Sequence, residues 1–150
     1  MCGNKRCLSL VFLVFLLALG LAGGVFCLRQ SRERQNARNA GHDLAAKLAR
    51  CKTISWRYSI EYSHHYSDGD PEFAMIRDKV KRALERPARE QTSKIKGWLI
   101  FRDENGVVLW TGDVYSDILR VSDWEFQFEG EGDSGEIQEA FWRINRRKSP

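Results

Sequence analysis

The feature that most constrains this chain is an uninterrupted run of apolar and small residues near its N-terminus. Residues 7–28, CLSLVFLVFLLALGLAGGVFCL, contain no charged side chain. A helix of this length would measure about 33 Å, enough to cross a hydrocarbon core of roughly 30 Å. The run therefore predicts a transmembrane anchor, and residues 1–6 would form a short charged tail in front of it.

A cleaved signal peptide is the alternative interpretation of this segment. Lys5 and Arg6 form a charged n-region, and Ala18-Leu19-Gly20 offers a small-x-small cleavage site. The apolar character resumes over residues 25–28, which a signal peptide does not require. The length of the run favours retention as an uncleaved anchor, whereas cleavage would release a secreted or periplasmic domain.

The charges that flank the run leave the orientation of the chain open. Four arginines follow it closely, namely Arg29, Arg32, Arg34 and Arg38. By the positive-inside rule they favour a cytoplasmic domain, yet a short basic N-terminus before a single span is also typical of exported domains. We expect a single-pass protein of the cell membrane with the side undecided. In the cytoplasmic case the four arginines would bind anionic lipid headgroups of the bilayer, at about 1 kcal/mol each.

The remaining sequence is long enough for one small domain. Residues 29–52 read as a basic juxtamembrane segment and a helix, because small and apolar residues recur at steps of three and four, although Asn39 and Gly41 weaken its middle. Residues 53–150 then form the domain. Cys51 is the one cysteine outside the apolar run and its flank, so we expect a small buried residue without a disulfide partner.

The domain sequence alternates between strand and helix patterns. Apolar and polar residues alternate over residues 54–62, which predicts one strand. A helix should begin at Asp70, as its cap, and Pro71, and it should end before Pro87. Further strands are predicted on both sides of Asn105-Gly106 and over residues 123–129, followed by a helix over residues 136–147.

These elements predict the α+β class. The expected architecture is an N-terminal transmembrane helix followed by a small domain, with a mainly antiparallel sheet of about four strands and two to three helices. At Asn105-Gly106, a two-residue type I′ turn and a three-residue loop with a glycine bulge both fit, and they differ by one residue of register.

The segment SHHYSDGDPE is the best candidate for a metal site. His64, His65 and Asp68 supply imidazole and carboxylate ligands of the kind that zinc and other divalent ions prefer. Adjacent histidines in a strand point to opposite faces, however, so a bend would be needed to bring both to one ion. We identify no cofactor and no catalytic motif in the sequence, and we expect a protein that is not an enzyme.

Charge is segregated along the chain. Residues 29–102 are predominantly basic, whereas Arg120 is the one basic residue among many acidic ones in residues 103–142. The basic helix could cover the acidic hairpin region, or two faces of opposite charge could bind partners and support self-association. The small net charge of the domain disfavours nucleic acid as a partner.

The sequence therefore supports one leading hypothesis. We expect a membrane-anchored protein-interaction domain with an accessory, assembly, exclusion or immunity role. The alternative from another functional class is a sensor for a metal or small ligand, centred on His64 and His65.

Overall fold

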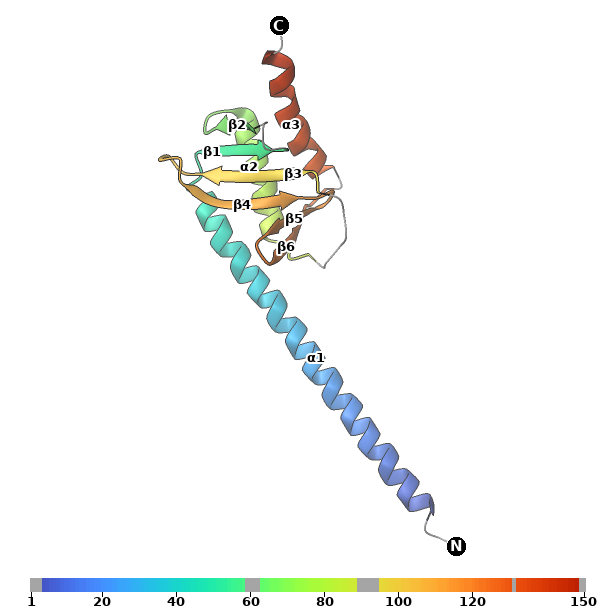
Figure 1. Ribbon diagram of the computed structural model, residues 1–150. Helices are drawn as coiled ribbons and strands as arrows, with labels where there is room; N and C mark the ends of the chain where they lie inside the picture. Colours follow the sequence, from blue (N-terminus) through green and yellow to red (C-terminus); the bar gives the residue numbers. More distant parts are fainter. Residues whose placement is uncertain (1–3, 59–62, 89–94, 131, 149–150) are drawn as a thin grey trace. The chain divides into compact units, whose positions relative to one another are not determined.

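The computed structural model of the protein describes residues 4–58, 63–88, 95–130 and 132–148 (Figure 1). Among them, the side chains of residues 4–14, 22, 63 and 144–148 are not described. The chain divides into two units, Met1–Asn36 and Ala37–Pro150. Within the described residues the second unit is an α+β domain with an antiparallel sheet, so the predicted class is confirmed.

The N-terminal part is one continuous helix, α1 (Asn4–Leu48). Asn39 and Gly41 do not break it, because Gly41 is buried against the domain and Leu44 and Leu48 belong to the core. The side chains of residues 7–14, the first part of the predicted anchor, lie outside the described part of the chain. Among the residues that are described, no helix is both long enough and apolar enough to cross a membrane.

The sheet has six strands in the described residues, in the order β2-β1-β3-β4-β5-β6, and every neighbouring pair is antiparallel. The strands are β1 (Thr53–Arg57), β2 (Ser63–Ser67), β3 (Gly97–Arg102), β4 (Val108–Val114), β5 (Ile118–Val121) and β6 (Trp124–Gln127). The chain crosses from β2 to β3 through α2 (Pro71–Leu84), and α3 (Asp133–Lys148) follows β6.

One core lies between the sheet and the helices. In Figure 1, α2 runs behind the strands, and α3 contacts the end of the sheet that carries β2. Both α2 and α3 turn an apolar face into this core. The buried core includes Phe73, Ile76, Val80, Ala83 and Leu84 of α2, and Ile137, Ala140 and Phe141 of α3.

The region after β1 differs from the prediction of one strand over residues 54–62. β1 ends at Arg57, Tyr58 is exposed, and residues 59–62 lie outside the described part of the chain. The histidine segment forms strand β2, which pairs with β1. Both paired strands carry the alternating pattern, so periodicity alone does not separate β1 from β2.

The β3–β4 connection resolves the two alternatives for its turn. Gly106 has a φ of 76°, whereas Asn105 does not have a positive φ, which excludes a type I′ turn. The Gly106 N–H donates to the Asp103 carbonyl, and the Asp103 N–H donates to the Val107 carbonyl. The loop is therefore the longer form with glycine in the left-handed region, and a further bulge shifts the register next to Arg102.

Two local predictions are wrong in detail. Asp70 occupies the N-cap position of α2, but its carboxylate accepts a hydrogen bond from the Ser67 N–H (2.7 Å) and not from the helix. The final helix begins at Asp133, three residues before the predicted start. The prediction for Cys51 is confirmed: it is a buried free thiol that contacts the Thr53 carbonyl oxygen at 3.2 Å, and burial raises its pKa.

The β5–β6 turn carries the one positive φ among described non-glycine residues, at Ser122 (53°). Two residues, Ser122 and Asp123, connect the strands, and a positive φ at the first position favours glycine. We expect Ser122→Gly to raise the free energy of unfolding by about 0.5–1 kcal/mol, measured by denaturant titration of the full chain in micelles. Ser122→Ala is the matched control and should give no such gain; equal stability of the two variants would contradict this assignment of strain.

Candidate interaction surface

The side of the sheet turned away from α2 and α3 carries an open surface, which we call the outer face. Side chains alternate along each strand, so Leu99 and Phe101 enter the core while Trp98 and Ile100 point the other way. The strand register aligns one residue from each of five strands in a single row across this face, namely Arg57, Trp98, Asp113, Arg120 and Glu125.

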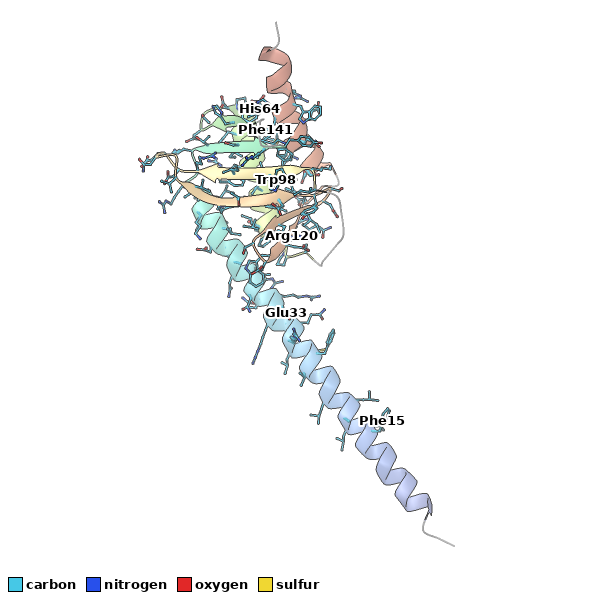
Figure 2. The ribbon with its side chains drawn as sticks, in the orientation of Figure 1. Phe15, Glu33, His64, Trp98, Arg120 and Phe141 are labelled. Carbon is cyan, nitrogen blue, oxygen red and sulfur yellow. The ribbon has the colours of Figure 1, made fainter. Side chains whose placement is uncertain are left out.

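The centre of the outer face contains apolar groups. The Trp98 side chain is 37% exposed, although it lies in the middle of the sheet on β3 (Figure 2). Ile100 next to it is half-buried, and Thr111, which pairs with Ile100, is exposed. A large aromatic side chain that stays partly exposed at the middle of a sheet is typical of a binding hot spot.

Polar interactions hold the charged side chains around this centre in place. Arg120 donates from Nε to the Glu125 carboxylate at 2.8 Å and from Nη1 to the Tyr115 hydroxyl at 3.1 Å. The Glu125 hydrogen bond, above all, raises the pKa of Arg120, and the nearby Asp113 charge adds to this effect. Arg102 donates to the Ser55 hydroxyl at 2.8 Å. The rim of the outer face is thus charged and ordered.

A groove of about 480 Å³ adjoins the β5–β6 hairpin. It is lined by Ala37 of α1, Ala88 and the hairpin residues 120 and 122–125. The groove combines the Trp124 ring with charged groups of both signs and with the strained Ser122 backbone. The groove shares Arg120 and Glu125 with the polar rim of the outer face.

The structure does not gather the predicted metal ligands into one site. His64 is half-buried, and its Nε2 atom has no hydrogen-bond partner among the described residues, whereas His65 is exposed on the opposite face of β2. Asp68 pairs with Lys52 at 2.6 Å, which lowers the pKa of Asp68. In the described part of the chain, no group of three or more His, Cys, Asp or Glu side chains is placed to hold a metal ion.

A buried cluster of ionisable groups was missed by sequence reasoning. Lys79 of α2 pairs with Asp133 at the start of α3, and both are only 8% exposed; Glu136 lies 3.0 Å from the Lys79 ammonium. Burial lowers the pKa of Lys79, but the two hydrogen-bonded carboxylates outweigh burial and raise it overall. Burial raises the pKa of Asp133, but Lys79 and the Gly130 N–H outweigh it and lower it overall.

This cluster joins α2 to the start of α3. The Asp133 carboxylate also accepts from the Gly130 N–H at 3.0 Å, and Lys79 stands between the two carboxylates of α3. Nearby, Arg82 and Arg86 pair with Glu129 at 3.3 and 2.7 Å. In the described residues, the basic helix and Arg86 after it therefore pair with the acidic segment after β6, whereas cover of the acidic hairpin region was one of two alternatives that the sequence left open.

The four candidate headgroup-binding arginines lie on α1. Arg29, Arg32, Arg34 and Arg38 are all exposed, and Arg29 forms an ion pair with Glu33 four residues later at 3.0 Å. Figure 2 shows Glu33 on the helix between Phe15 and the C-terminal part of α1. Exposed arginines with an apolar run before them are compatible with contacts to anionic lipid.

Comparisons with protein-family models, curated proteins and solved structures found no match to this chain.

Proposed function

We propose that the protein is a single-pass membrane protein whose α+β domain binds another protein at the membrane surface, in an accessory, assembly, exclusion or immunity role. The observation that carries the proposal is the outer face, where Trp98 is exposed at the centre of an ordered, charged rim. Rigid aromatic anchors surrounded by polar groups are the usual energetic centres of protein interfaces. Binding, and not catalysis, is the role that we infer.

The anchor part of the proposal rests on residues 7–28. This run carries no charge, and the large apolar side chains described in it, including Phe15, Leu21 and Phe26, are more than half exposed. Each such side chain would gain about 1.5–3 kcal/mol from removal of its surface from water, and a bilayer offers that environment. The exposed arginines after the run would then lie at the headgroups.

Fusions after Pro150 test the anchor and the side of the membrane. Alkaline phosphatase and green fluorescent protein are attached separately, expressed in a bacterial host and blotted for size. Phosphatase activity with a full-length band would indicate an anchored, exported domain, and fluorescence alone would indicate a cytoplasmic one. A band shortened by about 2 kDa would indicate a cleaved signal peptide and would overturn the anchor.

Photocrosslinking tests the interaction surface. A benzophenone amino acid replaces Thr111 on the outer face or, as a control, Glu139 on α3, and both positions are exposed. In intact cells we expect a discrete adduct from position 111 only. Equal labelling from both positions, or none from either, would count against a protein partner at the outer face.

A zinc titration tests the alternative sensor role. We expect the unfolding midpoint of the full chain in micelles to stay unchanged with added zinc, because the described residues around His64, His65 and Asp68 do not converge. A saturable rise in the midpoint, abolished by His64→Gln, would establish the sensor role in place of our interpretation.

A further inference from the structure

An exposed tryptophan and an unpaired carboxylate lie side by side on the outer face. Trp98 on β3 and Asp113 on β4 are directly opposite each other in the strand register. Residues in this relation point to the same face of the sheet, with Cβ atoms about 4.5–5.5 Å apart. The indole is partly exposed and the carboxylate is half-buried. Together they border one open spot, which we call the Trp98–Asp113 site.

Asp113 has no direct partner in the part of the chain that the structure describes. Its carboxylate accepts no side-chain hydrogen bond there and takes part in no ion pair. A half-buried charge is screened less by water than an exposed one, and part of its hydration is already lost. Asp113 therefore favours a cation supplied from outside the chain.

Arg120, the cation that follows Asp113 in the row, is bound to other groups. It lies opposite Asp113 on β5, on the side away from Trp98. Its Nε and Nη2 atoms both donate to the Glu125 carboxylate, and its Nη1 atom donates to the Tyr115 hydroxyl at 3.1 Å. The guanidinium also lies over the Tyr115 ring, 5.0 Å from its centroid. Glu125 thus compensates Arg120, and the negative charge of Asp113 remains uncompensated.

The site is acidic on one side of the indole only. On the other side of Trp98 stands Arg57 of β1, which has an interaction of its own within the chain. A cation that approaches the indole is therefore attracted to the β4 side, where Asp113 lies. This asymmetry fixes where the cation binds.

An aromatic ring beside a carboxylate is suited to a guanidinium group. Arginine stacks on the face of tryptophan, and its planar fork donates two parallel hydrogen bonds to one carboxylate. The lysine ammonium is a compact point charge and lacks both the planar surface and the fork. Tryptophan and arginine are also the residues most enriched among the energetic centres of protein interfaces.

We propose that the outer face binds its protein partner through an arginine of that partner, which stacks on Trp98 and pairs with Asp113. The inference rests on the proposed function, since it names the chemistry that the partner presents to the same surface. Ile100 and Thr111 form the next pair along the same two strands on this face. They provide a contact for the apolar stem of the arginine.

The first experiment titrates the full chain, in uncharged maltoside micelles, with the peptide acetyl-Gly-Arg-Gly-Arg-Gly-amide. The indole N–H resonance of Trp98, assigned by its loss in Trp98→Phe, is followed by NMR spectroscopy. We expect a saturable shift of this resonance. The same peptide with neutral citrulline in place of arginine should cause none, and the lysine peptide should bind at least threefold more weakly.

A charge-removal variant tests the role of the carboxylate. Asp113→Asn should weaken binding of the arginine peptide at least fivefold. Asp78→Asn is the matched control, because it removes the same charge from an exposed position on α2, which runs behind the strands (Figure 1). It should leave the affinity unchanged. Far-UV circular dichroism of both variants checks the fold directly.

The second experiment carries the test to the partner itself. The benzophenone amino acid is placed at position 111 in intact cells, as in the test of the interaction surface. Asp113→Asn should lower the yield of the adduct at least fivefold, whereas Asp78→Asn should leave it unchanged.

Three results would overturn the inference. They are absence of a Trp98 shift with the arginine peptide, equal binding of the arginine and lysine peptides, and an adduct from position 111 that Asp113→Asn leaves intact. In each case, a discrete adduct from position 111 would leave the proposed interaction function standing. Absence of any adduct there would remove both proposals.

Discussion

Replacement of Gly41 by alanine is expected to destabilise the domain by about 3 kcal/mol. A Cβ atom at this position would lie 2.1 Å from the Leu84 carbonyl oxygen and 3.1 Å from the Phe126 ring. The first contact is with backbone at the end of α2, so no rotamer change can relieve it. α1 would have to move away from α2 and β6, and this opening outweighs the gain of about 1 kcal/mol in helix propensity.

The measurement is denaturant unfolding of the full chain in micelles, followed by tryptophan fluorescence. Gly23→Ala in the same helix is the control, because a Cβ there would meet nothing within 4 Å. That variant should leave the unfolding midpoint of the domain unchanged. If Gly41→Ala were as stable as the parent protein, the result would show that α1 does not pack closely on α2.

Gly41 also shows why local rules gave an incomplete view of α1. In the sequence, Asn39 and Gly41 lower helix propensity and indicate a possible break. In the structure, tertiary packing requires a residue without a side chain at this point, and the helix continues through it. Propensity describes an isolated helix, whereas the contact with Leu84 depends on a residue far away in the sequence.

The sheet was predictable in class but not in strand number. The patterns of β1, β3, β4 and β6 are visible because each alternates or adjoins a strong turn signal. β5 was missed because it has four residues, ILRV, between two Ser-Asp pairs, SD at 116–117 and 122–123. A run of this length carries too few periods to identify a strand, although the flanking turn residues were a usable signal.

The outer face could not be derived from the sequence. The row from Arg57 to Glu125 depends on four registers between strands, and a shift of one residue would send each side chain to the opposite side of the sheet. The glycine loop at Gly106 and the bulge next to Arg102 set one of these registers. The charge segregation that we noted in the sequence acquires a location only once the strand order is known.

Removal of either partner from the Lys79–Asp133 pair is expected to cost about 3 kcal/mol. Each replacement, Lys79→Met or Asp133→Asn, leaves a charged group in a site that is 8% exposed. The loss of unfolding free energy in the double variant should be smaller than the sum of the losses in the two single variants. When both partners are replaced, neither charge of the pair remains in the buried site without its partner. If the effects of the two replacements on stability were fully additive, Lys79 and Asp133 would not be energetically coupled, and the prediction would be wrong.

The surface pair Lys52–Asp68 provides the matched control. It joins the same two residue types at 2.6 Å, but its side chains are 50% and 43% exposed. Lys52→Met should therefore lower the free energy of unfolding far less than Lys79→Met does, since water screens the pair and solvates the remaining carboxylate. The comparison isolates burial as the cause of the difference between the two pairs.

The pH dependence of the buried pair has a defined sign at each end. The pKa of Asp133 is lowered in the folded protein, so its contribution is present above the usual aspartate value of 3.8 and is lost as the pH falls through the folded-state pKa. The pKa of Lys79 is raised, so its contribution is present below the usual value of 10.5 and is lost as the pH rises through the folded-state pKa. The stability difference between the parent chain and Lys79→Met should thus be largest and flat between these limits and should shrink beyond both. If this stability difference varied steeply near neutral pH, another group in the cluster would have to titrate there. The same pH series on Asp133→Asn would then show whether the Asp133 carboxylate is that group.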